Sequence, residues 1–278
     1  MNFFNIISEI EKVDPEFQDR VSPRRAAIKN ITSFGSKVAV AALPFAVSVL
    51  FKKAYGQTAT VGVNDVLNYA LKLEYLEAAF YNQGVAATAL NIPAADKAYL
   101  TTAQGHENQH VAFLQGILGS AAVKPAASYD FTAKGTFPTV FTNYDTFLAV
   151  AQALEDTGVR AYKGQAPNLL GNQTVLSAAL AIHSVEARHA SAVRQIRRSR
   201  GVNIKPWISG SASMANDTGI SAVDGNYAGE NNVMQGGLDV TKLPAVSGTT
   251  SITAAIESFD EPLTMAQVVA LVAPFGVS

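Results

Sequence analysis

The chain has 278 residues, of which 48% are hydrophobic and 15% are charged, and it contains no cysteine. This length suits one sizeable domain with extensions or two small domains, and the lack of cysteine excludes disulfides, thiolate metal sites and cysteine nucleophiles. The formal net charge is −1, but residues 1–56 hold eight Lys/Arg and five Asp/Glu, so the remainder is acidic. No basic patch large enough to neutralise a run of phosphates remains, which argues against nucleic-acid binding.

Residues 1–56 have the order of an export signal. Paired arginines in "SPRRAAIKN" (22–30) precede fourteen mostly apolar residues (38–51) and a small-residue stretch that ends at Gly56. This order is typical of a secretory signal, and the double arginine favours the twin-arginine route. Fourteen helical residues span only ~21 Å, which is short of the ~30 Å hydrocarbon core of a bilayer. We therefore expect export to the periplasm, cleavage after Gly56 and no stable membrane span after processing. An ordinary Arg-Arg pair on a core or surface helix is the alternative.

Four later segments have helical periodicity. The expected helices are 64–84, 94–119, 143–164 and 172–201. Asn64 is the expected cap of the first helix and Gly84 its expected stop. The connections inside each pair of helices are short, whereas residues 120–142, rich in Pro, Gly and Thr, separate the two pairs. Two hairpins with one long central connection form the ferritin-like topology, so we predict an all-α ferritin-like four-helix bundle over 57–201.

The composition changes after this bundle. Residues 208–250 are rich in Gly, Ser, Asn and Asp, and 260–275 read as one amphipathic helix. We expect residues 202–278 to form an irregular extension with a terminal helix, packed on the bundle or on a second subunit of a homo-oligomer. The run "RQIRRSR" (194–200) is interpreted as a solvated helix end that the helix dipole favours.

Each predicted helix places one glutamate within an apolar stripe. In the second helix, for example, Leu100, Leu114 and Ile117 are expected to point inward together with Glu107. The four glutamates are Glu74, Glu107, Glu155 and Glu186. A carboxylate in a core needs a partner, because burying an unpaired charge is costly.

The two hairpins repeat one pattern. "LEYLEAAFY" (73–81) and "LEDTGVRAY" (154–162) both contain Leu-Glu followed by a tyrosine seven residues after the glutamate. The next helix in each hairpin carries Glu-x-x-His, within "GHENQHVAFL" (105–114) and "IHSVEARHAS" (182–191), and these segments hold all four histidines of the chain. Two such hairpins related by a pseudo-twofold axis would bring four glutamates and two histidines together, as two halves of one metal site.

This combination of residues predicts a dinuclear metal centre. Its expected ligands are Glu74, Glu107, His110, Glu155, Glu186 and His189. Glutamate and histidine three residues apart share a helix face, so both reach one ion, and four carboxylates neutralise two divalent cations. Oxygen-rich ligation with one imidazole per ion suits Fe or Mn and tolerates Zn or Co. We expect two Fe ions, with Mn as the alternative and Zn less favoured; a metal-free bundle is the competing interpretation.

Within this centre we assign Glu107 and Glu186 as bridging ligands. Glu74 and His110 would then complete one ion, and Glu155 and His189 the other.

Five further residues are candidates for an outer position around the ligands. Tyr81 and Tyr162 share a face with the glutamates of their helices and are expected to orient carboxylates by hydrogen bonding. His106 and His183 could support the ligands or be ordinary exposed or core histidines. Glu77 is the rival of Glu74, and the repeat favours Glu74 because the residue matching Glu77 in the third helix is Gly158.

These motifs resemble the ferritin-like diiron-carboxylate superfamily. Over residues 64–201 they look most like exported bacterial ferritin-like domain proteins related to plant desiccation-related proteins. The resemblance implies a four-helix bundle with a dinuclear Fe or Mn site. Activities in the superfamily include ferroxidation, peroxide consumption, manganese-catalase chemistry, oxygenation and radical generation. The chain lacks the cysteine-ligated iron domain of rubrerythrins, and its long extension departs from cage-forming ferritins.

Two functional hypotheses follow. In the first, the protein is an oxidoreductase or oxidant scavenger whose metal pair reacts with O2 or peroxide, the small oxidant being its partner. In the second, it is a non-catalytic stress-protective or partner-binding bundle with a structural or vestigial metal site. A dimanganese catalase is a third interpretation, distinguished by its metal and by oxygen release from peroxide.

Overall fold

The computed structural model describes residues 61–211, 213, 215–243 and 248–277. They belong to one compact unit, Ala54–Ser278. The expected export signal, residues 1–56, lies outside the described residues. Among the residues that are described, no helix is both long enough and apolar enough to cross a bilayer.

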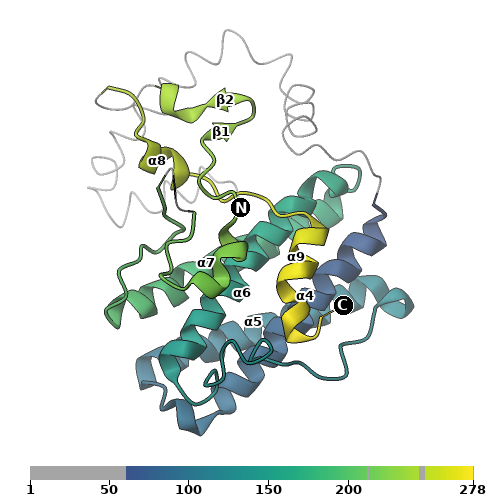
Figure 1. Ribbon diagram of the computed structural model, residues 1–278. Helices are drawn as coiled ribbons and strands as arrows, with labels where there is room; N and C mark the ends of the chain where they lie inside the picture. Colours follow the sequence, from purple (N-terminus) through teal and green to yellow (C-terminus); the bar gives the residue numbers. More distant parts are fainter. Residues whose placement is uncertain (1–60, 212, 214, 244–247, 278) are drawn as a thin grey trace, which may run out of the picture. The chain divides into compact units, whose positions relative to one another are not determined.

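Four long helices form the bundle (Figure 1). They are α4 (Val63–Ala86), α5 (Ala94–Leu118), α6 (Tyr144–Gln165) and α7 (Gln173–Ser199). Helix α4 packs along α5 and α6 packs along α7, so the bundle consists of two hairpins. A long connection joins α5 to α6, as the figure shows by the colour change from blue to teal. The all-α ferritin-like bundle with a long crossover between its second and third helices is therefore confirmed.

Side-chain caps fix the first turns of α6 and α7, whereas α4 and α5 begin without one. Asn143 and Asn172 cap α6 and α7 by accepting hydrogen bonds from backbone N–H groups three residues later, as asparagine at an N-cap does. The expected cap at Asn64 is wrong, because α4 begins at Val63 with Gly62 as its N-cap residue. The expected stop at Gly84 is also wrong, since α4 continues to Ala86.

Gly84 has a packing role instead. A Cβ on this residue would lie 2.2 Å from the Phe147 ring of α6, so only glycine lets the ring lie against α4. Phe147 in turn stacks on Phe80 with 4.8 Å between ring centroids, which ties the two hairpins together through an aromatic core.

One residue of α5 expected to point inward does not: the side chain of Ile117 is 43% exposed.

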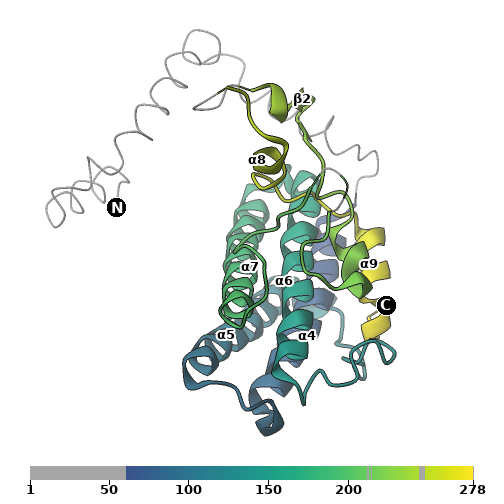
Figure 2. The same cartoon turned by 60° about the vertical axis from the view of Figure 1, so that its left-hand side comes forward.

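The extension after α7 has little regular structure but ends in a helix. Its short elements are the 3-10 turns Ser221–Tyr227, Val240–Lys242 and Ala273–Phe275, the strand pair β1 (Met234–Gln235) and β2 (Leu238–Asp239), and helices α8 (Ile252–Ile256) and α9 (Met265–Val272). Helix α9 starts later than expected because Thr264 and Gln267 form a capping box that fixes its first turn. Figure 2 shows the extension running over α6 and α7, with α9 beside the bundle.

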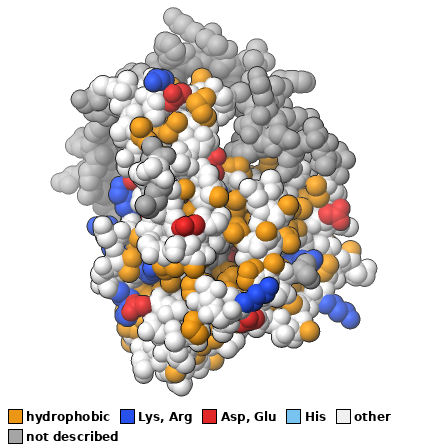
Figure 3. All heavy atoms as spheres, in the orientation of Figure 1, with side chains coloured by type: hydrophobic (Ala, Val, Ile, Leu, Met, Phe, Trp, Pro, Cys, Tyr) orange, Lys and Arg blue, Asp and Glu red, His pale blue; other side chains and the backbone are white. Residues whose placement is uncertain are grey.

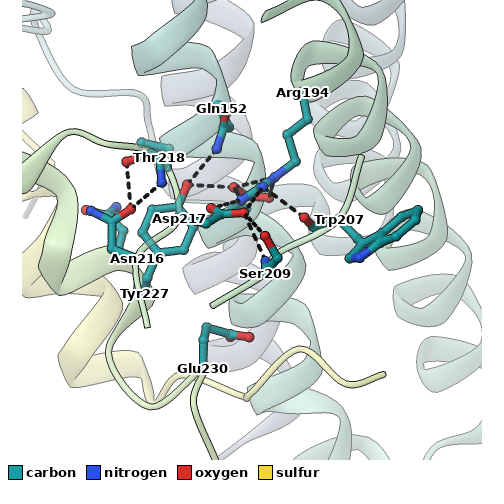
Figure 4. Close-up of polar contacts among 12 residues, drawn as sticks. Gln152, Arg194, Trp207, Ser209, Asn216, Asp217, Thr218, Tyr227 and Glu230 are labelled. Carbon is teal, nitrogen blue, oxygen red and sulfur yellow. Dashed lines mark hydrogen bonds and ion pairs between the residues drawn. The ribbon is translucent and has the colours of Figure 1, made fainter. Parts of the chain in front are cut away.

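A buried ionic cluster fastens the extension to the bundle (Figure 4). Arg194 of α7 pairs with Asp156 of α6 at 2.7 Å and with Asp217 of the extension at 2.9 Å. Tyr227 donates a hydrogen bond to the same Asp156 at 2.6 Å. The interpretation of 194–200 as a solvated helix end is thus wrong for Arg194 and Arg197, which are both buried. We call these four residues, Asp156, Arg194, Asp217 and Tyr227, the clasp.

A second contact lies one turn further along α6. Arg160, also fully buried, pairs with Glu230 of the extension at 2.7 Å. Four residues later, Gly164 lets the extension pass close to α6, because a Cβ there would lie 1.9 Å from the carbonyl oxygen of Leu263.

On the face drawn in Figure 3, charged side chains are scattered singly among hydrophobic and uncharged ones, so that face carries no concentrated charge.

Candidate metal centre

Six side chains from the four helices meet in the interior of the bundle. Their potential ligand atoms form two groups, each with all atoms within 4.8 Å of one another. One group is Glu74, Glu107, His110 and Glu186, and the other is Glu107, Glu155, Glu186 and His189. Glu107 and Glu186 belong to both groups, as expected for the two residues assigned as bridging. The structure thus brings all six predicted residues together, and their role as ligands stays a prediction.

The helix geometry explains this convergence. Glu107 and His110 are three residues apart on α5, and Glu186 and His189 are three apart on α7, so each pair shares one helix face. All four glutamates are fully buried, whereas the exposed fraction is 8% for His110 and 2% for His189. Buried carboxylates at this density need compensating positive charge.

The two histidines supply part of that compensation. His110 Nδ1 lies 3.1 Å from carboxylate oxygens of Glu74, Glu107 and Glu186. His189 Nδ1 lies 2.7 Å from Glu107 and 3.5 Å from Glu155. Glu107 therefore directs one oxygen to each histidine, which places it between the two halves of the cluster.

Burial and these contacts shift the pKa values of the cluster, and the direction of each shift depends on the partners of the group. Burial raises the pKa of Glu186 well above its ordinary value, and the charges of neighbouring carboxylates raise it further. Burial would also raise the pKa of Glu107, but hydrogen bonds from both histidines outweigh it and hold the pKa at about 2. Burial alone would lower the pKa of His110, yet its carboxylate partners raise it to about 12. Protons on the imidazoles thus occupy the positions where cations would neutralise the carboxylates.

The two tyrosines of the repeat contact the cluster across the hairpins. Tyr81 of α4 donates a hydrogen bond to Glu155 of α6, and Tyr162 of α6 donates one to Glu74 of α4. Burial raises the pKa of both phenols well above the usual value, so both remain donors. Each tyrosine therefore orients the carboxylate of the other hairpin rather than the one on its own helix.

Of the two remaining histidines, one lies beside the cluster. His106 Nδ1 lies 2.9 Å from His189 Nε2, and the two rings stack with 5.2 Å between centroids. This contact leaves His189 Nδ1 facing the glutamates and fixes the ring orientation. His183 does not join the cluster; its ring lies near the backbone of Val159, and burial lowers its pKa.

Glu77 is a fifth buried carboxyl group next to the cluster. It is 4% exposed, and its pKa is raised well above the usual value by burial first and then by the charge of Glu186. A Cβ on Gly158 of α6 would lie 3.2 Å from a Glu77 oxygen and 3.3 Å from a Glu186 oxygen. The mismatch in the repeat thus has a physical cause, since the glycine makes room for the extra acid.

Sequence reasoning missed Tyr99 of α5. Its hydroxyl lies 3.5 Å from the carbonyl oxygen of His189, and its pKa is raised by burial and by the nearby charges of Glu155 and Glu107. Tyr99 precedes Glu107 by eight residues, a spacing that returns to the same helix face, and this spacing is the signal that could have found it.

The donor set of the cluster fits divalent metal ions. Both carboxylate oxygens of Glu186 and one each of Glu107 and Glu155 are buried and have no hydrogen bond of regular geometry among the described residues, although a histidine nitrogen lies within ion-pair distance of three of these four oxygens. Buried oxygens of this kind normally have a partner, and oxygen-rich sets with imidazole are the ligands of Fe and Mn. The residues therefore suit a pair of such ions.

One comparison with known proteins agrees with the fold. Residues 62–199 match the protein family described as ferritin-like domain. No curated protein and no solved structure matches the chain significantly. The matched residues span all four helices and the whole cluster, so residues 62–199 form a ferritin-like domain.

Proposed function

We propose that this protein holds two Fe ions, with Mn as the alternative metal, and uses them to react with O2 or peroxide. The observation that carries the proposal is the convergence of four glutamates and two histidines into two overlapping groups that share Glu107 and Glu186. Glu74 and His110 would complete one ion, and Glu155 and His189 the other. Two bound Fe(II) ions would supply two electrons, which with two protons reduce O2 to hydrogen peroxide or hydrogen peroxide to two water molecules.

The surrounding residues have defined tasks in this function. Tyr81 and Tyr162 hold the outer carboxylates by donating hydrogen bonds, so the lone pairs of Glu155 and Glu74 keep a fixed direction. His106 holds the ring of His189. The packed helices leave all four carboxylates fully buried, so bulk water does not reach them. Charge interactions are stronger in such a site than in water.

The direct test is metal binding followed by oxidation. The full chain is depleted of metal with a chelator, titrated with Fe(II) without oxygen, and then exposed to O2 or to hydrogen peroxide in separate arms. We expect two irons per chain and growth of ferric absorbance in the near ultraviolet. Glu107→Gln should lose both ions, whereas Glu257→Gln, which changes a surface acid that pairs with Lys205, should behave like the unaltered chain. Two bound irons that neither oxidant oxidises would refute the redox function.

Metal identity needs a separate measurement. Elemental analysis of protein purified from its native host compartment distinguishes Fe from Mn and Zn. A dimanganese catalase would contain Mn and release oxygen vigorously from peroxide. A bundle with a vestigial, empty site would be inert to peroxide, and its melting temperature would not respond to chelator. A bundle with a purely structural site would also be inert to peroxide but would lose melting temperature when chelator removes the metal.

We also propose that the protein is exported to the periplasm by the twin-arginine route, on the basis of the paired arginines and the short apolar segment in residues 1–56. That route carries folded proteins, which is compatible with metal loading before export. Fusing residues 1–56 to a folded reporter tests it: the reporter should reach the periplasm. The double change Arg24→Lys and Arg25→Lys should retain it in the cytoplasm, and unchanged export of that variant would contradict the proposal.

A further inference from the structure

Side chains of all four helices line an apolar pocket beside the cluster, and some of its α5 residues are exposed to solvent. Helices α5 and α7 contact each other little, unlike the two hairpin pairs. At the outer end of the pocket lie Phe113 and Ile117 of α5, which are 45% and 43% exposed. Ala178 and Ala179 of α7 form the opposite wall. The pocket therefore reaches the surface between these two helices.

The inner end of the pocket lies one helical turn from the metal centre. Ala70, Leu114 and Ile182 line it there, and each lies four residues from a proposed ligand on the same helix face. The corresponding ligands are Glu74, His110 and Glu186.

A fourth lining residue makes direct contact with the cluster. Tyr162 borders the pocket and donates its hydroxyl hydrogen bond to Glu74. The same residue thus forms the wall of the pocket and holds a carboxylate of the centre.

Size and chemistry restrict what can use this path. The cavity volume is about 20 Å³, enough for one or two molecules the size of water and far too small for an organic substrate. No charged residue lines the pocket, and its side chains are hydrophobic apart from Tyr69, Tyr162 and Gln165. Such a cavity offers few hydrogen bonds, so it suits an apolar gas and disfavours hydrogen peroxide, which must leave its hydrogen bonds with water to enter.

We infer that the pocket between α5 and α7 is the path by which dioxygen reaches the metal centre. This inference rests on the proposed function and narrows it: O2 is the oxidant that the path admits, and peroxide reaches the centre elsewhere or not at all. Phe113 and Ile117 form its mouth, and Ala179 lines it on the α7 side. These residues position a gas molecule and take no part in metal binding.

The first test measures O2 contact without any metal chemistry. Metal-depleted protein with labelled isoleucine methyl groups is equilibrated with O2, and the paramagnetic relaxation of each methyl is recorded by NMR. Ile182, at 6% exposure, should relax several-fold more than Ile204 and Ile208, which are equally buried at 5% and 4% but do not line the pocket. Equal relaxation at all three residues overturns the inference.

Variants provide the second test. Ala179→Leu fills the pocket and should reduce the O2 effect at Ile182 and raise the O2 concentration needed for half-maximal Fe(II) oxidation. Ala181→Leu, on the exposed side of the same helix, is the matched control and should change neither. Phe113→Ala widens the mouth and should increase the O2 effect, which keeps the inference testable if Ala179→Leu does not fold.

The two proposals fail in distinguishable ways. If Ile182 responds to O2 but bound Fe(II) is oxidised by neither oxidant, the path stands and the proposed function falls. If Fe(II) is oxidised by O2 while Ile182 stays silent and the variants match the control, the function stands and the path falls. Slowing of the peroxide reaction by Ala179→Leu to the same extent as the O2 reaction overturns the selectivity for O2.

Discussion

Tyr81 of α4 donates its hydrogen bond to Glu155 of α6, a residue 74 positions away in the chain. Tyr162 of α6 returns the contact to Glu74 of α4. Each hairpin thus fixes an outer carboxylate of the other hairpin, and the geometry of the centre depends on how the hairpins pack. An isolated hairpin would contain the glutamate without its tyrosine.

Removing one of these hydroxyl groups should weaken metal binding. We expect Tyr81→Phe to lower metal affinity ~10-fold or more, because loss of a hydrogen bond to a ligating carboxylate commonly has that effect. Isothermal titration of metal-depleted protein measures it. Tyr144→Phe is the matched control, since Tyr144 of the same bundle donates to Asp96 at 3.1 Å, away from the cluster. Equal affinities of the two variants would contradict the role of Tyr81.

The two glutamates assigned as bridging, Glu107 and Glu186, should differ in the metal-depleted protein. Glu107 has a pKa of about 2 and is ionised between two histidines, so Glu107→Gln removes a charge that both use and should cost about 1.5–3 kcal/mol of unfolding free energy at neutral pH. The raised pKa of Glu186 keeps it protonated, so Glu186→Gln should have little effect. Both variants should lose metal binding. Urea unfolding with chelator present separates them, and equal losses of stability would disprove the assigned charge states.

The stability of metal-depleted protein should fall as pH rises. Burial raises the pKa of Glu74 to about 7, and carboxylate partners raise that of His189 to about 11 against the effect of burial. A group with a raised pKa in the folded state contributes stability that is complete below its unfolded pKa and is lost as pH rises through the folded value. Glu107, with its lowered pKa, loses its contribution only in acid below its ordinary value. Between about pH 5 and about pH 8 the melting temperature should therefore decrease.

Metal should reverse this trend. Bound cations replace the protons held by the cluster, so metal affinity should rise with pH and the loaded protein should keep its melting temperature over the same range. Calorimetry with and without chelator checks both trends. A metal-depleted sample that becomes more stable toward alkaline pH would show that the raised carboxyl pKa values are wrong.

Gly158→Ala should fail to give the usual stabilisation of a helical glycine-to-alanine change. Alanine favours a helix over glycine by about 1 kcal/mol. Gly116 lies on the exposed face of α5 with no atom within 4 Å of a new Cβ, so Gly116→Ala should gain much of this stability. At Gly158 the Cβ would press on Glu77 and Glu186, so the gain should disappear and metal affinity should fall. Chemical denaturation and metal titration of both variants test this. A stabilised Gly158→Ala that binds metal normally would rule out the crowding.

The clasp should matter far more than a surface ion pair. Arg194→Met leaves Asp156 and Asp217 buried without their cation, which should cost about 3–5 kcal/mol. Arg200→Met, which breaks an exposed pair with Asp145, should cost below about 1 kcal/mol. Unfolding free energies of the two variants are to be compared. Similar small losses would mean that the extension does not depend on Arg194.

Sequence reasoning predicted the elements that repeat. The Glu-x-x-His pairs and the Glu-x6-Tyr pairs both recur at fixed spacing, so helix periodicity alone placed Glu74, Glu107, Glu155 and Glu186 on inward faces. It could not pair Tyr81 with Glu155, because that contact depends on the relative height of two helices from different hairpins. Spacing along one chain segment carries no information on this height.

The misjudged residues share another cause, namely contacts made by distant segments. Gly84 resembles a helix stop but serves the close packing of Phe147. Arg194 resembles a solvated helix end, yet aperiodic residues of the extension bury it. Ile117 fits the α5 stripe, yet no distant segment among the described residues covers it and its side chain is 43% exposed. In each case tertiary packing overrides a valid local pattern.

Glu155 and Asp156 are neighbours on one turn of α6, and their side chains leave the helix in different directions. Glu155 enters the carboxylate cluster, whereas Asp156 receives Arg194 and Tyr227 of the clasp. The C-terminal extension therefore stabilises the turn of α6 that carries Glu155, through its contact with the neighbouring Asp156. Proteolytic removal of the extension should therefore disturb the carboxylate cluster although none of the six predicted ligand residues lies in the extension.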